Sequence, residues 1–425
     1  MNTTYLSRDA IRRVLLSLVI IQQDALIKKG ALNKAQTLRS HVVNRNDAEI
    51  DILEVNEDSL GFDSLSRLDL VLAVTQFFQL QVTGVEDYLL IKQKIGDWVD
   101  LVERHFELIA ENAQIAFQTS GSTGAPKTVI HDLRALRTEV EALLSGPIGK
   151  LSTHARVMSM VPPHHIYGFL FSCLLPSMTG NDTISLYHCP PTRSLALAKG
   201  GDLLIATPYI WEKLAQSGLQ FRPDVIGISS ASPTTQKTWS VLDKTALSGL
   251  VEIYGATETG GIGFRTTFDT AFEILPHLEC GNQVIRTKNT KGTTLDIQDE
   301  LRWVGPRAFK INGRLDHVVQ IAGVNVSPAH VVRVIKDIAG VKDANVQFHE
   351  GRLQALIVPM KMHELTDALA ESVRNKIVRN LPAPARAATI HFSASLRYTD
   401  MVKIENWTQD IGQPLSSQRT TKTDT

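Results

Sequence analysis

The stretch FQTSGSTGAPK at residues 117–127 begins at the last residue of a short apolar run, Ile115 to Phe117. Its small residues let successive backbone N–H groups turn toward an anion, and its hydroxyl groups and single lysine add further donors. The spacing from Gly121 to Lys127 includes a proline and does not fit a Walker A loop. A flexible Gly/Ser linker between domains is the alternative for such a string. The stretch therefore predicts a strand that leads into a phosphate-binding loop.

C-terminal to this stretch, short apolar runs alternate with helical patterns. The runs are rich in Val and Ile and are bounded by Gly, Pro or Ser; they lie at 157–161, 203–207 and 225–229. The helical patterns between and around them lie at 128–144, 209–217 and 235–247. This alternation is typical of an α/β domain with a largely buried sheet.

Composition limits the class of protein. The 425 residues are 43% hydrophobic and 21% charged, which excludes a disordered, collagenous or membrane-spanning chain. Lys+Arg and Asp+Glu both total 44, so the net charge does not indicate nucleic acid as a partner. The three cysteines, Cys173, Cys189 and Cys280, form no CxxC pair, which argues against disulfides and zinc and favours a reducing compartment.

The apolar run at residues 14–21 invites interpretation as a signal peptide. Asp9 precedes it, the run is short and no small-x-small cleavage site follows. Ile11, Leu15, Leu18 and Ile21 fall near helical spacing instead, so we expect an amphipathic helix. No apolar run reaches the ~18 residues of a membrane span, and the expected location is cytoplasmic.

The first 110 residues contain helical patterns at 7–28, 64–79 and 91–107, with a short run at 85–90 and a polar stretch at 29–58. In LGFDSLSRLDL, residues 60–70, an Asp-Ser pair follows a glycine and can cap a helix. Leu65, Leu68 and Leu72 recur at helical spacing and predict one buried stripe. Ser64 then lies at the exposed, positive end of the helix, which favours a bound anion. An ordinary N-cap is the alternative.

This N-terminal segment resembles an acyl carrier protein over roughly residues 1–106, on its Asp-Ser-Leu signature at Ser64 and the later helix with Trp98 and Val99. The resemblance implies that Ser64 receives a 4'-phosphopantetheine arm from a separate phosphopantetheinyl transferase. Two features depart from the family: the long segment before Ser64, and Arg67, which lowers the acidity of the second helix. A small bundle that only looks like a carrier is the alternative.

Two further motifs follow the phosphate loop: IYGATETGG at 253–261 and NGRLDHVVQIAG at 312–323. Each by itself has a structural explanation as a turn. In this order, the three motifs together resemble the adenylate-forming enzymes, which include acyl-CoA synthetases, aryl acid ligases and nonribosomal adenylation domains.

The resemblance implies roles for individual residues. Glu258 holds Mg2+, which suits a hard cation. Thr257 contacts the α-phosphate, His165 lies in the acyl-pocket motif and Asp316 is the hinge of a mobile C-terminal domain. Residues expected to bind ATP are Thr119, Ser120, Gly121, Ser122, Thr123, Gly124, Lys127, Ser230, Tyr254, Asp299 and Arg314.

Near the C-terminus, residues 396–404 resemble the family's last motif, in which Lys403 bridges the attacking carboxylate and the α-phosphate. A cation at such a place is worth roughly 4 kcal/mol at 4 Å in a partly screened site. Val402 replaces the usual glycine and Gln320 a frequent lysine. An exposed lysine without a role is the alternative.

The expected fold is multidomain: a small all-α four-helix carrier bundle (1–108), a truncated α/β AMP-binding domain (109–312), a mobile α+β C-terminal domain (313–407) and a disordered tail (408–425). The family's usual N-terminal subdomain is missing. The core is then either active in pared-down form, or covered by the carrier, or degenerate.

The sequence thus predicts an AMP-forming acid–thiol ligase that uses ATP and Mg2+ to activate a small carboxylic acid, for which an aromatic acid is one candidate. The ligase is expected to load the acid onto its own Ser64 arm. A downstream ketosynthase or acyltransferase in polyketide or fatty acid biosynthesis is the expected user. Free coenzyme A as the acceptor, or a carrier scaffold with a degenerate ligase half, are the alternatives.

Overall fold

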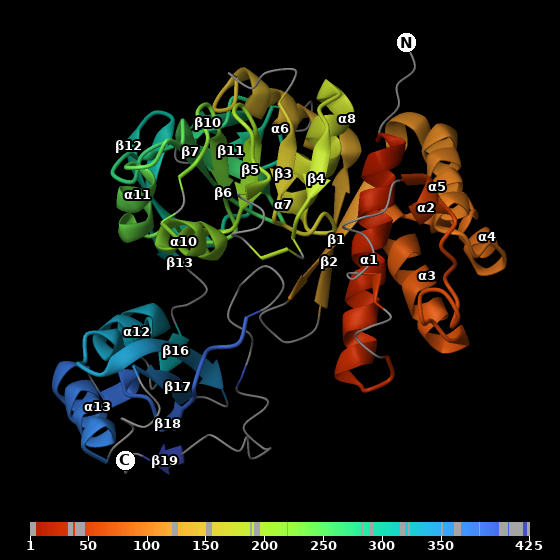
Figure 1. Ribbon diagram of the computed structural model, residues 1–425. Helices are drawn as coiled ribbons and strands as arrows, with labels where there is room; N and C mark the ends of the chain where they lie inside the picture. The colour runs from red at the N-terminus through yellow and green to blue at the C-terminus, as the bar shows by residue number, and fades with distance from the viewer. Residues whose placement is uncertain are drawn as a thin grey trace. The chain divides into compact units, whose positions relative to one another are not determined.

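The computed structural model divides the chain into two compact units (Figure 1). The first comprises Met1–Asp296 and Val304–Phe309, and the second comprises Ile297–Trp303 and Lys310–Thr425. The structure describes residues 6–32, 37–38, 47–120, 126–149, 155–187, 189–190, 196–218, 220–281, 284–288, 292–314, 319–321, 324–349, 352–360, 367–381, 383–398, 407 and 420–422.

The N-terminal region of the first unit is helical. Its helices are α1 (Arg8–Lys28), α2 (Asp47–Asp51), α3 (Ser64–Phe78), α4 (Glu86–Ile91) and α5 (Ile95–Ile109), with single 3-10 turns η4 (Leu80–Val82) and η5 (Ala110–Asn112). Ser7 caps α1 by accepting from the Ala10 N–H, and Asp63 caps α3 by accepting from the Ser66 N–H at 2.8 Å. The helical patterns predicted at 7–28 and 64–79 are confirmed.

Helix α1 is buried on a wider face than an amphipathic surface helix. Three residues of the predicted stripe, Ile11, Leu15 and Leu18, are buried, whereas Ile21 is half-buried. The buried neighbours are Ala10, Val14, Leu16, Val19 and Ile20. The helix packs against α3 and α5 and also against η6 (Leu170–Leu174), a π-helical turn of the sheet region. Because α1 is covered from both regions, it is a core helix of the first unit.

Helix α3 buries a different face from the one its sequence predicts. Leu65, Leu68 and Leu72 are 70%, 41% and 50% exposed, so the predicted buried stripe is wrong. The buried residues are Ser66, Leu70, Val71, Val74, Phe77 and Phe78. Phe77 meets Phe117 edge to face at a centroid distance of 5.6 Å, so the helix is packed onto the strand that leads into the phosphate loop. Two apolar stripes compete in this helix, and the aromatic one is buried.

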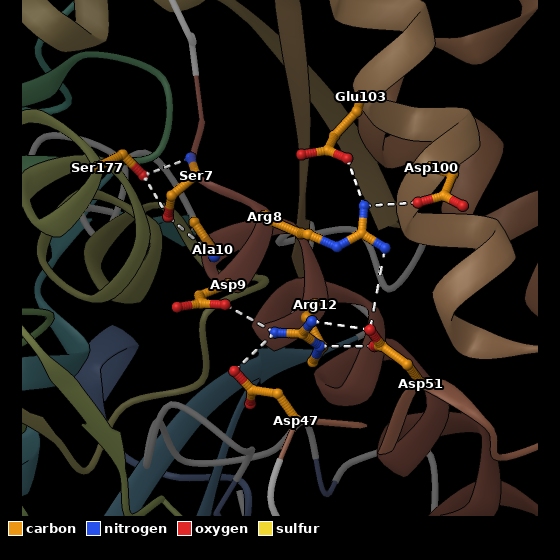
Figure 2. Close-up of polar contacts among 10 residues, drawn as sticks. All are labelled: Ser7, Arg8, Asp9, Ala10, Arg12, Asp47, Asp51, Asp100, Glu103 and Ser177. Carbon is orange, nitrogen blue, oxygen red and sulfur yellow. Dashed lines mark hydrogen bonds and ion pairs between the residues drawn. The ribbon is translucent and has the colours of Figure 1, made fainter. Parts of the chain in front are cut away.

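Two arginines join the start of α1 to α2 and α5 (Figure 2). Arg8 pairs with Asp100 and Glu103 of α5, each at 2.5 Å. Arg12 donates from Nε to Asp51 at 2.7 Å and also pairs with Asp9 and Asp47. The Arg12 side chain is only 6% exposed, whereas those of Asp9 and Asp47 are 59% and 65% exposed.

Replacement of Arg12 by methionine is expected to lower the free energy of unfolding by about 2 kcal/mol. This loss is smaller than the usual cost of breaking a buried ion pair, because water already reaches the carboxylates of Asp9 and Asp47. Urea unfolding at pH 7 measures the change. The exposed pair of Arg104 with Glu107 provides the control, and Arg104→Met is expected to cost less than about 0.5 kcal/mol. Equal losses in the two variants would contradict the prediction.

The central sheet has the strand order β12-β13-β9-β8-β7-β6-β5-β3-β4. The strands from β3 to β7 are parallel, and β7, β8 and β9 are antiparallel neighbours. Their bounds are β3 (Val157–Ser159), β4 (Thr183–Ser185), β5 (Leu203–Ala206), β6 (Ile226–Ser229), β7 (Gly249–Ala256), β8 (Gly260–Arg265), β9 (Phe272–Ile274), β12 (Asp299–Gly305) and β13 (Ala308–Arg314). The division between the two units passes through β12 and β13.

Helices cover both faces of the parallel strands. On one face, Trp211 of α10 (Pro208–Gln216) and Trp239 of α11 (Gln236–Leu242) join Met158 and Leu204 in one buried cluster. Alternate strand residues point the other way, and Ile205 among them is also fully buried. On that side, α6 (Leu133–Ser145) contacts β8, and η6, between α7 (Ile166–Phe169) and α8 (Leu175–Thr179), contacts β3. The predicted α/β domain with a buried sheet is confirmed.

A hairpin precedes this sheet. β1 (Gln114–Ser120) pairs antiparallel with β2 (Pro126–Asp132), from Gln114 opposite Asp132 to Ser120 opposite Pro126. The predicted helix at 128–144 is therefore wrong over its first five residues, where the chain forms β2. The reason is local: Thr128, Val129 and Ile130 are β-branched, and Asp132 caps α6 by accepting from the Arg134 N–H at 2.8 Å. A second small hairpin joins β10 (Leu278–Gly281) and β11 (Val284–Thr287).

The second unit packs helices on a small sheet. Its order is β16-β17-β18-β19, with bounds β16 (Val341–His349), β17 (Arg352–Pro359), β18 (Thr389–Phe392) and β19 (Thr420–Lys422). A further hairpin joins β14 (Val319–Ile321) and β15 (Val324–Val326), and the helical elements are α12 (Pro328–Lys336), α13 (Asp367–Asn380) and the 3-10 turn η9 (Ala383–Ala385). Val331, Ile335, Val373 and Ile377 meet the sheet in one core.

The tail predicted as disordered at 408–425 is wrong at Thr420–Lys422, because β19 pairs antiparallel with β18 and supplies an edge strand. The other residues of that tail lie outside the described residues. Cys173, Cys189 and Cys280 are unpaired in the structure. No helix in the described part of the chain is long and apolar enough to cross a membrane.

Candidate functional site

The carboxyl ends of neighbouring strands lie along one edge of the central sheet. β3, β5, β6 and β7 run parallel, so the loops after them emerge at the same edge. His165 follows β3, Ser230 follows β6, and Tyr254, Thr257 and Glu258 lie at the end of β7. Ligands of open α/β sheets bind outside such carboxyl ends. The fold therefore brings these residues, chosen from the sequence, to one edge.

The turn between β7 and β8 presents Thr257 and Glu258. Gly255 pairs with Gly261 across a register shift, and a side chain at Gly255 would overlap the Gly260 carbonyl. Gly260 has a φ of 68°, which disfavours other residues. The two strands thus approach as closely as backbones allow and leave Glu258 exposed at the tip.

Glu258 fits a magnesium ion that arrives with ATP. Its exposed carboxylate is a hard oxygen ligand. Among the described residues, no group of three acidic, histidine or cysteine side chains could hold a metal by itself. Mg2+ is commonly held by one or two carboxylates together with substrate phosphates and water. The single carboxylate at this turn therefore suits the magnesium ion of Mg·ATP as substrate.

His131 joins the phosphate-loop hairpin to this turn. It lies on β2, and its Nε2–H donates to the Thr257 carbonyl at 2.6 Å. A carbonyl only accepts, so the proton is on Nε2. Burial lowers the pKa of His131, and the bond to Thr257 and the charge of Glu258 oppose this only in part. No motif identified His131 in the sequence.

The residues expected to wrap the phosphates lie on this hairpin and its connection. Thr119 and Ser120 end β1, and Lys127 lies exposed at the start of β2. The other members, Gly121, Ser122, Thr123 and Gly124, lie outside the described residues. The hairpin register brings the two ends of the loop together at Ser120 and Pro126.

A buried acid organises the loop after β6. Glu252, 2% exposed on β7, accepts from the Thr234 N–H and from Arg265 Nε, each at 2.6 Å. Ser230 donates its hydroxyl to the Ile253 carbonyl at 2.9 Å. The sequence predicts a role for Ser230 but no motif includes Glu252, although an acid within the apolar run of β7 is a detectable signal of a buried polar contact.

The same loop holds backbone strain. Ala231, next to Ser230, has a φ of 81°, in the region that favours glycine. Such a conformation persists only where the surroundings hold it, and the bonds of Ser230 and Thr234 on either side do so. Strained residues of this kind cluster at functional sites.

Tyr254, expected near adenine, is half-buried beside two phenylalanines. Its ring meets Phe309 edge to face at 5.5 Å and Phe272 at 5.8 Å, and those two rings stack on each other. The aromatic cluster sets the angle of the tyrosine ring.

The segment after β3, expected in the acyl pocket, is held by contacts that the sequence did not predict. His164 Nδ1 lies 2.6 Å from the hydroxyl of Ser17 on α1, both buried, and the rings of His164 and His165 are 4.2 Å apart. The Tyr167 hydroxyl donates to the carbonyls of Ala206 at 3.1 Å and Ile228 at 2.9 Å. Burial raises the pKa of Tyr167 well above its usual value.

The hydroxyl of Tyr167 anchors the segment, because its partners are carbonyl groups at the carboxyl ends of β5 and β6. Gly168 is required there, because a Cβ atom would overlap the Pro162 carbonyl.

The remaining residues chosen from the sequence lie elsewhere. Asp299 begins β12 and Arg314 ends β13, both in the second unit, and Asp316 and Lys403 lie outside the described residues. Ser64 is exposed as the first residue of α3. The roles assigned to these five residues stay predictions.

The chain is similar to known proteins in sequence and in fold. The profile of the AMP-binding enzyme family matches residues 31–300, a range that begins within the expected carrier segment. The 4-coumarate–CoA ligase of Cereibacter sphaeroides is 38% identical over 402 residues, covering 95% of this chain and 97% of the relative. That of Rhodobacter capsulatus is 38% identical and covers 83% of this chain and 91% of its own.

Among solved structures, the ATP-bound MatB from Rhodopseudomonas palustris superposes with a TM-score of 0.59 at 16% identity. The superposition covers 92% of this chain and 91% of that one. At this identity the likeness establishes the fold alone.

Proposed function

Because the chain belongs to the AMP-binding family of adenylate-forming enzymes, we propose that it activates an aromatic carboxylic acid with ATP and transfers the acyl group to coenzyme A. ATP-dependent activation of an acid as acyl-AMP is the chemistry of this family. The observation that carries the proposal is the Thr257–Glu258 turn held against the phosphate-loop hairpin at the carboxyl edge of the sheet.

In the first half-reaction, a carboxylate oxygen of the acid attacks the α-phosphorus of Mg·ATP. The bond from that phosphorus to the bridging oxygen breaks, and pyrophosphate leaves with the electron pair. Glu258 holds the Mg2+ of the substrate, and the hairpin loop holds the β- and γ-phosphates. Lys403 places a positive charge where negative charge gathers, which lowers the barrier.

In the second half-reaction, the thiol of coenzyme A attacks the acyl carbon of the acyl-adenylate. A thioester forms, the bond to the phosphate oxygen breaks and AMP leaves, while the thiol proton passes to water. The second unit contains Lys403 and the predicted hinge Asp316. We propose that it turns about Asp316 between the two half-reactions, so that Lys403 withdraws from the adenylate.

The acid is proposed from the names of the relatives. Two relatives matched over most of their length are 4-coumarate–CoA ligases, which indicates a hydroxycinnamic acid as substrate. This agrees with the aromatic acid expected from the sequence. The buried contact between Ser17 and His164 joins α1 to the segment that would form the acyl pocket.

Coenzyme A is favoured over the Ser64 arm as acceptor for a physical reason. Helix α3 shares its core with the ligase, since the ring of Phe77 packs on that of Phe117 in β1. The centroid of the Phe77 ring also lies 5.9 Å from that of the Phe169 ring in α7. A carrier has to travel with its arm between sites, whereas a helix that belongs to the core stays in place. The match to the CoA ligases covers 95% of the chain and so includes most of these helices.

We expect wild-type protein, expressed with a phosphopantetheinyl transferase, to convert ATP, 4-coumarate and coenzyme A into the CoA thioester. The Ser64→Ala variant is expected to do so at the same rate within about twofold, because surface substitutions away from a site are nearly neutral. Thioester formation followed by absorbance, together with the mass of the intact chain, measures both outcomes. Ser240→Ala, at an exposed serine of α11, is the control.

Two results would overturn parts of this proposal. An acyl increment on the intact chain that disappears in Ser64→Ala would restore self-loading as the function. Absence of acid-dependent pyrophosphate exchange with every aromatic acid tried would favour a chain that binds nucleotide without catalysis.

A further inference from the structure

The segment that continues from the phosphate-loop hairpin into α6 contacts the Thr257–Gly261 turn at both of its ends. His131, near the end of β2, donates to the Thr257 carbonyl at the start of the turn. Glu139, in the second turn of α6, accepts from the Gly261 N–H at 2.9 Å, at the end of the turn. Glu258, the predicted magnesium ligand, lies between these two contacts.

Glu139 is an unusual residue for its position. It is 4% exposed on the face of α6 that otherwise buries Leu136, Val140 and Leu143. Burial raises the pKa of Glu139 to about 7, and the bond from Gly261 opposes this shift. A buried carboxyl group costs stability unless it is fully paired, and an apolar residue of similar size is often at least as stable. Stability therefore does not explain its presence.

The glycines of the turn fit around this carboxyl group. A Cβ atom at Gly260 would lie 2.5 Å from Glu139 Oε2, and one at Gly261 would lie 2.6 Å from Oε1. Only residues without a side chain allow the carboxyl group to reach the backbone here. The two glycines of the turn thus leave the space that the Glu139 carboxyl group occupies.

We propose that His131 and Glu139 are positioning residues that clamp the Thr257–Gly261 turn from its two ends and so fix Glu258 relative to the phosphate loop. This inference rests on the proposed function, because it takes Mg·ATP as the ligand of the turn. The clamp has a mechanical basis: both side chains belong to the continuous segment of β2 and α6, so this segment and the turn are held together. Both residues act through the backbone of the turn.

The test uses four variants of the full-length protein. His131→Leu and Glu139→Leu remove one contact each, whereas His131→Gln and Glu139→Gln keep a donor and an acceptor of nearly the same length. Each leucine variant is expected to lower kcat/KM for Mg·ATP about 10- to 100-fold, the range seen when a partner of a metal ligand is lost. The KM for the acid is expected to stay within about twofold, since the turn lies outside the segment after β3.

The glutamine variants are expected to recover to within about threefold of wild type, because they restore the hydrogen bonds. Glu141→Leu, at an exposed acid of the same helix, is the control and is expected to match wild type. The two leucine changes combined are expected to lose less than the product of the single losses, because both act on one turn. If the double variant loses kcat/KM by the full product of the two single losses, the clamp is wrong.

Calorimetric binding of Mg·ATP gives a readout that does not depend on turnover. If wild type binds Mg·ATP but ligates no acid, the proposed function fails while the clamp is still tested by the loss of affinity in the leucine variants. If wild type is active and the folded leucine variants bind and turn over Mg·ATP normally, the clamp is wrong and the function stands. Should Glu139→Leu not fold, His131→Leu with its glutamine rescue decides the matter.

Discussion

Glu258→Gln is expected to slow acid-dependent exchange of pyrophosphate into ATP by about a hundredfold or more, equivalent to about 2.7 kcal/mol of transition-state stabilisation. Glu258 is exposed at the tip of a turn that two glycines draw tight, so the amide will be accommodated without refolding. What changes is the charge, and with it the affinity for the magnesium ion of Mg·ATP.

The dependence of the lost exchange activity on Mg2+ tests whether Glu258 is a magnesium ligand. Raising Mg2+ is expected to recover part of the activity, because a neutral oxygen remains a weak ligand for a hard cation. Glu279→Gln, at an exposed acid of β10, is the control and is expected to match wild type. A Glu258→Gln protein with normal exchange at limiting Mg2+ would remove Glu258 from the metal site.

Lys403→Ala is expected to reduce adenylate formation by about 100- to 1,000-fold and to leave thioester formation from supplied acyl-adenylate within about threefold of wild type. A lysine that stabilises negative charge at the α-phosphate matters only while that phosphate is attacked. If the second unit then withdraws Lys403, the thiol reacts without it. Pyrophosphate exchange reports the first half-reaction, and thioester formation from synthetic adenylate reports the second.

Lys342→Ala is the matched control, since Lys342 is an exposed lysine of β16 in the same unit and has no proposed role. Equal losses in both half-reactions of Lys403→Ala would mean that the lysine supports folding or both steps. No loss in either would identify it as an ordinary surface residue, which was the alternative at the outset.

The predictions that succeeded rest on local chemistry. The strands at 157–161, 203–207 and 225–229 formed because short β-branched runs bounded by turn residues have few other low-energy options. Tyr254, Thr257 and Glu258 lie at the carboxyl edge of the sheet because of its topology, and the roles assigned to them stay predictions. Parallel strands must end at one edge, so residues that follow them are brought together by topology alone.

The predictions that failed needed knowledge of partners. In α3, the stripe of Leu65, Leu68 and Leu72 and the stripe that ends in Phe77 both have helical spacing. The second is buried because Phe117 and Phe169 lie beside it, and neither is near it in sequence. A pattern gives the period of a helix but not the direction of its neighbours.

The positioning contacts were missed for the same reason. His131, Glu139 and Glu252 belong to no motif, and their partners are mostly backbone groups, which have no sequence signature. Glu139 is separated from Gly261 by 122 residues, and only folding reveals that its carboxyl group is buried beside the turn.

The amino-acid order by itself determined the family: three motifs at residues 117–127, 253–261 and 312–323 resemble the adenylate-forming enzymes, and the chain belongs to the AMP-binding family. Each motif is a short run of the chain, so local order suffices to specify it. The sequence did not determine whether the N-terminal helices form a separate carrier or part of the ligase core. That depends on which apolar faces meet, and such contacts join residues more than 80 positions apart, as between Phe77 and Phe169.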